Sequence, residues 1–97
     1  MKDRLDQLRK RILDIDGELV RLLAERARLA LEIGRIKCDL GVPLQDPDRE
    51  REVLKNAKRI PHHPLEPSQV DALFTRILEI CRDAQIQAAP AAGSGRS

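Results

Sequence analysis

Apolar residues recur along the first third of the chain at alternating steps of three and four positions. This is the heptad spacing of a helix that packs along another helix. The series comprises Leu5, Leu8, Ile12, Ile15, Leu19, Leu22, Leu29, Ile33 and Ile36. It predicts one helix over residues 3–39, roughly 55 Å long at 1.5 Å per residue. Because a compact domain of about 100 residues has a radius of gyration of only about 13 Å, we expect a second chain to cover most of this seam.

Glycine and proline mark the ends of three predicted helices. Gly41 can adopt the left-handed conformation that ends the first helix. A second helix is expected to begin at Asp46, a favourable N-cap, with Pro47 in its first turn. A third is expected to begin at Pro67. The pattern thus predicts an all-α chain of three helices, the first of them very long.

Composition agrees with a single helical domain. The 97 residues include one Phe, no Trp and no Tyr. The core must therefore be aliphatic, and the shortage of aromatic and β-branched residues argues against a sheet. We expect the domain to span residues 1–88. The small residues and proline over 89–97 predict a disordered tail.

The net charge and its distribution indicate which kinds of binding partner to expect. Charged residues make up 35% of the chain, but the net charge is only +2. A nucleic-acid-binding protein more often has a one-sided basic patch and stacking aromatic residues, so we expect no nucleic acid partner. No apolar stretch is long enough for a signal segment or a membrane span, so we expect no membrane partner either.

Cysteine and histidine provide no metal or disulfide motif. Cys38 and Cys81 have neither the number nor the spacing of a disulfide framework or a zinc site. His62 and His63 lie in a loop bracketed by prolines, with no third ligand nearby. We therefore expect no metal, and a cytoplasmic protein with reduced thiols.

Three basic residues on or beside the seam are candidates for binding an anion. Arg26 stands where the heptad predicts an apolar residue, although a lone seam arginine is usually a register device or a snorkelling side chain. Lys37 follows after close to three helical turns, so both side chains share a face about 16 Å apart. Arg9 lies about 42 Å from Lys37 along the helix. Only an antiparallel partner would bring an Arg9 to the Lys37 end, whereas the structural alternative is that both residues form interhelical ion pairs.

The second and third predicted helices carry the other candidates. Asp46, Arg49 and Glu50 lie on one side of the first turns of their helix. Capping and the helix dipole explain Asp46, but they explain Glu50 less well and do not favour Arg49. Gln85 lies beside the apolar face of the third helix, where a glutamine is usually only the polar edge of the stripe.

These polar positions together resemble the all-helical class of chorismate mutase. Their frame is R-x16-R-x10-K-x8-D-x2-R-E-x34-Q, formed by Arg9, Arg26, Lys37, Asp46, Arg49, Glu50 and Gln85. The surrounding sequence is also similar, as in Ile-Gly-Arg-Ile-Lys over residues 33–37. The resemblance extends over residues 5–87. No single motif is specific for this class, but the seven polar positions in one frame together are specific for it.

The resemblance implies a stand-alone chorismate mutase of the shikimate pathway. Such an enzyme converts chorismate to prephenate by a Claisen rearrangement in aromatic amino-acid biosynthesis. Members of the class are intertwined homodimers with two active sites, each completed by one residue of the partner. The reaction involves no proton transfer or covalent intermediate, so positioning and preorganised electrostatics are the whole mechanism and no cofactor is expected. Association with another enzyme of the pathway is left open by the sequence.

The resemblance also implies roles for the basic residues and the amide. Arg26 is expected to bind the ring carboxylate, where its planar fork suits a bidentate contact. Arg9 is expected to bind the side-chain carboxylate from the partner chain, with help from Lys37. Lys37 and Gln85 are expected to donate to the ether oxygen, which becomes more negative in the transition state.

Residues of the second helix and one cysteine complete the expected site. Glu50 is expected to accept a hydrogen bond from the ring hydroxyl, assisted by the backbone near Asp46. Arg49 is expected to line the site and to orient Glu50 or a carboxylate. Cys81 occupies a position where the class often has a small hydroxyl residue near the ring carboxylate. Because a thiol is a weaker donor, Cys81 is either a weak ligand or only a packing residue.

Two alternatives differ in class from a mutase. An isochorismate-pyruvate lyase shares the fold and much of the anion-binding site, but the position of Glu50 is not acidic in that lyase. A helical dimerisation module without catalysis would explain the heptad. Such a module has no reason to place Arg26, Lys37 and Gln85 together.

Overall fold

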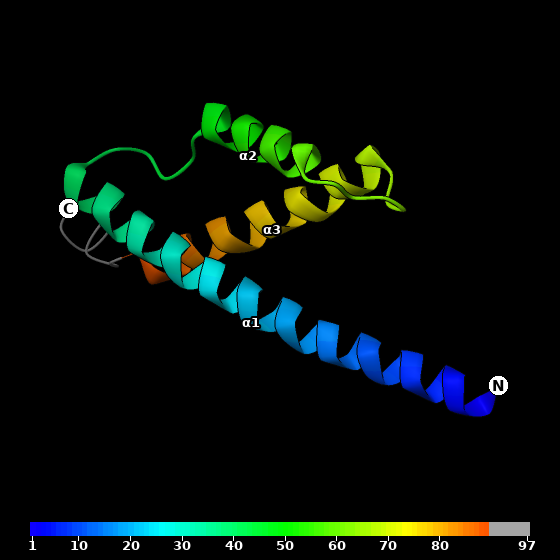
Figure 1. Ribbon diagram of the computed structural model, residues 1–97. Coiled ribbons are helices and arrows are strands. Elements are labelled where there is room, and N and C mark those ends of the chain that lie inside the picture. The colour runs from blue at the N-terminus through cyan, green and yellow to red at the C-terminus, as the bar shows by residue number, and fades with distance from the viewer. Residues whose placement is uncertain (90–97) are drawn as a thin grey trace.

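A computed structural model describes residues 1–89 of the chain, which form three helices (Figure 1). These are α1 (Lys2–Leu40), α2 (Pro47–Arg59) and α3 (Pro67–Ala88). Residues 1–89 include no strand. The all-α fold with one very long N-terminal helix is thereby confirmed.

Local sequence signals set the helix ends. Gly41 has φ 71° and ψ 24°, and its backbone N–H donates to the Cys38 carbonyl at 3.2 Å, which ends α1. The side chain of Asp46 accepts a hydrogen bond from the Arg49 backbone N–H at 3.1 Å and so caps α2. Pro67 occupies the first turn of α3. The predicted helix starts and the glycine stop are confirmed.

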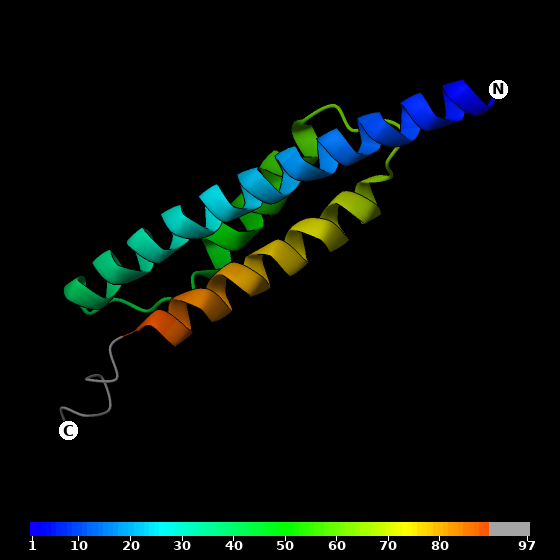
Figure 2. The same cartoon turned by 90° about the horizontal axis from the view of Figure 1, so that it is seen from below.

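The arrangement of the helices is open rather than compact. Helix α3 packs against both α1 and α2, with its C-terminal part beside the C-terminal half of α1 (Figures 1 and 2). The N-terminal half of α1 extends beyond the other two helices. The radius of gyration is 17.8 Å, against about 12.5 Å for a compact chain of this length.

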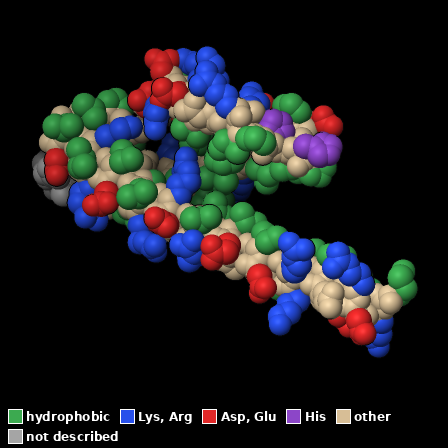
Figure 3. Space-filling model, in the orientation of Figure 1, with side chains coloured by type: hydrophobic (Ala, Val, Ile, Leu, Met, Phe, Trp, Pro, Cys, Tyr) green, Lys and Arg blue, Asp and Glu red, His purple; other side chains and the backbone are tan. Residues whose placement is uncertain are grey.

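The buried interior is correspondingly small. The buried apolar side chains are Ala30, Ala57, Val70 and Cys81. On α1, the two buried residues are Ala30 and Gly34, which lie against α3 and outside the heptad seam. Every apolar seam residue of α1 has between 39% and 57% of its surface exposed. Figure 3 shows apolar side chains open to solvent along the inner side of the molecule.

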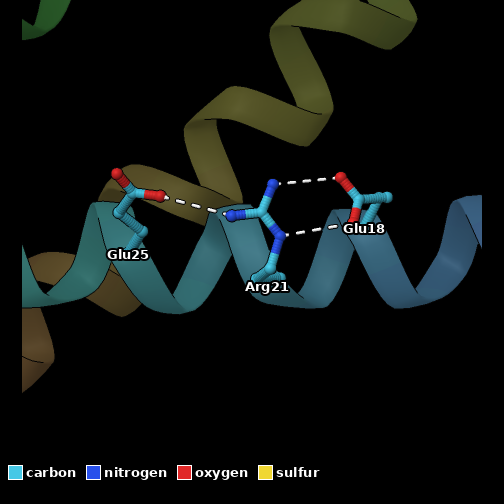
Figure 4. Close-up of polar contacts among 3 residues, drawn as sticks. All are labelled: Glu18, Arg21 and Glu25. Atoms are coloured by element: carbon cyan, nitrogen blue, oxygen red, sulfur yellow. Dashed lines mark hydrogen bonds and ion pairs between the residues drawn. The ribbon is translucent and has the colours of Figure 1, made fainter.

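Ion pairs support the exposed part of α1. The Arg21 guanidinium lies between two carboxylates of the same helix, 3.0 Å from Glu18 and 3.7 Å from Glu25 (Figure 4). All three side chains are more than half exposed. Each such pair contributes only about 0.3–0.5 kcal/mol, so these contacts cannot replace a packed apolar face.

Two further expectations concern the membrane and the tail. Within residues 1–89, none of the helices has a stretch long and apolar enough to cross a lipid bilayer. Of the tail expected over residues 89–97, only Ala89 is described, and it follows the last turn of α3. The rest of that expected tail lies outside the described residues.

Candidate active site

A cavity of about 280 Å³ lies between α1 and α2, with α3 along its floor. Figure 3 shows this hollow with Lys and Arg side chains around it. Seven of the expected site residues line it, namely Arg26, Lys37, Asp46, Arg49, Glu50, Cys81 and Gln85. The other lining residues are Arg82 and six apolar residues, namely Leu29, Ala30, Ile33, Leu44, Val53 and Leu78. All three helices and the α1–α2 loop therefore contribute to one site, which combines charged and polar side chains with apolar ones.

Arg26 points from the seam of α1 toward α3. Its Nη1 donates to the Cys81 Sγ at 3.2 Å, and Cys81 itself is 7% exposed. The sulfur atom is the acceptor in this contact, so Cys81 orients the guanidinium. This contact uses one of the five N–H donors of Arg26, which leaves the others for an anion.

Lys37 joins the end of α1 to the loop that follows it. Its Nζ donates to the Leu44 carbonyl at 3.2 Å. An ammonium group has three donors, so two remain available to a ligand. The contact with the loop thus holds the ammonium group at the cavity and leaves donors of Lys37 for a ligand.

Gln85 is held against the backbone of α1. Its Nε2 donates to the Ala30 carbonyl at 2.7 Å, and this contact fixes the amide orientation because a carbonyl can only accept. The second N–H of the amide remains available. Gly34 favours this close approach, since a Cβ at that position would lie 3.0 Å from the Gln85 Cγ and would crowd the side chain.

The first turn of α2 presents Asp46, Arg49 and Glu50 to the cavity, but the ion pairs differ from the expected ones. Arg49 pairs with Glu52 on the exposed side of α2. Glu50 Oε2 instead accepts from Arg82 Nη1 of α3 at 3.1 Å. Arg82 rather than Arg49 therefore contacts Glu50, while Arg49 remains part of the wall.

Arg9 is the one expected site residue that does not line this cavity. It lies in the exposed N-terminal half of α1, about 25 Å along the helix axis from Arg26. Within one chain it cannot contact a ligand bound beside Arg26.

Two further residues, not among the expected ones, bear on the site: Arg82 lines the cavity, and Gly34 lies against the side chain of Gln85. Arg82 lies between Cys81 and Gln85 on α3, and a spacing of three residues from Gln85 was the available signal. Gly34 lies inside α1, where a glycine costs about 1 kcal/mol relative to alanine. Such a glycine usually has a packing reason, which here is the approach of Gln85.

The charges of the lining residues favour an anion with two negative groups. The basic side chains are Arg26, Lys37, Arg49 and Arg82, and the acidic ones are Asp46 and Glu50. The excess is two positive charges, which matches two carboxylates. Guanidinium, ammonium and amide donors bind and polarise oxygen atoms, and none of these groups is a nucleophile activated by a base.

Comparisons with known proteins give the same picture. The chain matches the family model described as chorismate mutase type II over residues 8–86. The chorismate mutase of Methanocaldococcus jannaschii is 37% identical over 60 residues, which are 62% of this chain and 61% of the relative. A bifunctional chorismate mutase/prephenate dehydratase of Pseudomonas aeruginosa is 38% identical over 85 residues, covering 82% of this chain and 23% of the relative. The chain thus covers less than two thirds of the length of these curated relatives.

A solved structure is also similar. It is described as the structure of chorismate mutase (form II) from Thermus thermophilus. The two folds agree with a TM-score of 0.85 at 35% sequence identity, covering 88% of this chain and 97% of the other.

Proposed function

This chain belongs to the chorismate mutase type II family, and from that premise we propose that it catalyses the Claisen rearrangement of chorismate to prephenate. The observation that carries the proposal is one cavity lined by six of the seven polar residues of the frame, with an excess of positive charge. Chorismate carries two carboxylates, a ring hydroxyl and an ether oxygen. The cavity offers a donor or acceptor for each of them.

The free hydrogen-bond donors of the cavity support separate roles for Arg26, Lys37 and Gln85 in binding the substrate. Arg26, already oriented by Cys81, would bind the ring carboxylate. Lys37 and Gln85 would donate to the ether oxygen, because each keeps donors beyond its contact with the backbone. Donors fixed before the reaction stabilise the charge that develops as the C–O bond breaks, at no cost of reorganisation.

The acidic side of the cavity would bind the ring hydroxyl. Glu50 lies in the first turn of α2, and the capping contact of Asp46 sets where that turn begins. The Glu50 carboxylate would accept from the hydroxyl and so fix the ring while the side chain folds over it. Holding the reacting carbons in this geometry is itself a large part of the catalysis.

A second copy of the chain would complete each site. Exposed seam residues and an extended shape support an antiparallel homodimer in which α1 of one chain lies along the other. In that arrangement the partner's Arg9 would bind the side-chain carboxylate together with Lys37. Two unpaired cysteines agree with a cytoplasmic location, which we propose with it.

A substrate panel tests the proposed reaction. Purified protein is incubated separately with chorismate and with isochorismate, and the products are separated by liquid chromatography and identified against authentic standards, because prephenate has the same mass as chorismate. We expect prephenate from chorismate as the dominant product. Pyruvate from isochorismate as the dominant product would assign the chain to the lyase instead. No turnover from a folded helical dimer would favour a non-catalytic module.

A further inference from the structure

The cavity contains an ion pair that joins α2 to α3. Arg82 Nη1 lies 3.1 Å from Glu50 Oε2, and the two side chains are 25% and 30% exposed. All the other ion pairs among residues 1–89 are more exposed. One of these also joins α2 to α3, since Lys58 Nζ donates to Asp71 Oδ2 at 3.2 Å. Neither Lys58 nor Asp71 lines the cavity.

Besides joining α2 to α3, Arg82 affects the electrostatic potential of the cavity. A ligand with two carboxylates brings two negative charges close to the Glu50 carboxylate. Like charges in a partly desolvated site repel by several times more than they do in water. Arg82 cancels the charge of Glu50, whereas Arg49 is paired with Glu52 outside the site.

The geometry of the pair also leaves Glu50 able to act. Arg82 contacts only Oε2 of the carboxylate, so Oε1 is left to accept a hydrogen bond from a ligand. Arg82 comes from α3, which also presents Cys81 and Gln85 to the cavity. The ion pair thereby fixes the position of Glu50 relative to Cys81 and Gln85 of α3.

We propose that Arg82 is a positioning residue that holds the Glu50 carboxylate toward the substrate hydroxyl and offsets its repulsion of the substrate carboxylates. The proposal rests on the proposed mutase function. It makes Arg82 act through Glu50 rather than through its own contact with the substrate. Removing Arg82 should therefore weaken substrate binding mainly when residue 50 still carries its negative charge.

The test compares the two ion pairs that join α2 and α3. Arg82→Met and Lys58→Met each remove one cross-helix pair, so both should lower the midpoint of thermal unfolding to a similar degree. Only Arg82→Met should raise KM for chorismate, by roughly tenfold, with a smaller change in kcat. Arg82→Lys should restore part of the loss, because it returns the charge without the planar fork.

A double variant shows whether Arg82 acts through Glu50. In the Arg82→Met background, Glu50→Gln should lower KM again or leave it unchanged, because the unpaired carboxylate is gone. Losses that multiply independently, or an equal rise in KM for Lys58→Met, would overturn the proposal.

A binding measurement separates this proposal from the proposed function. Isothermal titration of prephenate, which has two carboxylates and a ring hydroxyl, makes the same comparison of variants without turnover. If the wild-type protein binds prephenate but produces none, the mutase proposal fails while the Arg82–Glu50 coupling is still measured. If it neither binds nor forms prephenate, both proposals are overturned.

Discussion

Arg26 places a charge at a position where the α1 seam requires an apolar side chain. A structural seam would gain from leucine here, because a desolvated charge is costly unless it is paired. We expect Arg26→Leu to leave the unfolding midpoint unchanged or raise it, while kcat/KM for chorismate falls by about 10²–10³-fold. Thermal unfolding and steady-state kinetics measure the two effects.

The control for this substitution is Arg28→Leu. Arg28 is exposed on the same helix and does not line the cavity, so its replacement should leave kcat/KM nearly unchanged. Full activity of Arg26→Leu would show that the seam arginine is only structural.

We expect Gln85 to determine how the activity depends on pH. An amide donates at any pH, so the wild-type enzyme should have a broad pH profile. A glutamate side chain donates only when protonated, and its usual pKa is about 4.3. Relative to wild type, Gln85→Glu should therefore be roughly tenfold or more active at pH 5 than at pH 8. Equal relative activity at both values would argue against contact with the ether oxygen, and the exposed Gln87→Glu serves as control.

At the scale of residues, the sequence was most informative where a polar side chain disagreed with its local pattern. Arg26 breaks a heptad, and Arg49 is not explained by capping. The pairing of Glu50 was not predictable, because Arg82 and Glu50 are 32 positions apart. Only the packing of α2 on α3 brings them together. Local spacing therefore indicates candidate residues but not their partners.

At the scale of elements, the two glycines within α1 separate packing from helix propensity. Gly17 has open space around it, whereas a Cβ at Gly34 would crowd Gln85. Gly17→Ala should stabilise the protein by up to about 1 kcal/mol without changing kcat. Gly34→Ala should lower kcat by roughly tenfold, because a small displacement of a positioned donor is costly. Chemical denaturation and steady-state kinetics measure both variants.

The outcome for Gly34→Ala that contradicts this account is unchanged kcat together with the same stabilisation as Gly17→Ala. Such a result would mean that Gln85 adapts without loss, and that the close approach is incidental.

The helices themselves were predictable from capping residues and periodicity, but their contact faces were less so. The heptad seam is the most apolar face of α1, yet α3 packs on the smaller residues Ala30 and Gly34. On α3, the apolar residues Leu73 and Ile80 are 54% and 49% exposed. Small residues allow close approach of two backbones, and hydrophobicity alone does not register this advantage.

At the scale of the molecule, one chain leaves much of its surface uncovered. Its accessible surface is 8039 Å², against about 5,600 Å² for a compact monomer of this mass. The uncovered side chains include the apolar residues of the whole α1 seam. The same helix that lacks a covering partner carries Arg9 far from the cavity. One antiparallel partner would resolve both features.

The measurement that tests the account most directly combines two inactive variants. In the proposed homodimer, Arg9→Ala and Lys37→Ala should each disable both sites, but a mixed dimer would have one site with both residues intact. Co-refolding the two variants should restore about a quarter of wild-type prephenate formation, since half of the dimers are mixed and one of their two sites is complete. Activity no greater than that of the separate variants, from proteins that sediment as folded dimers, would contradict a site shared between two chains.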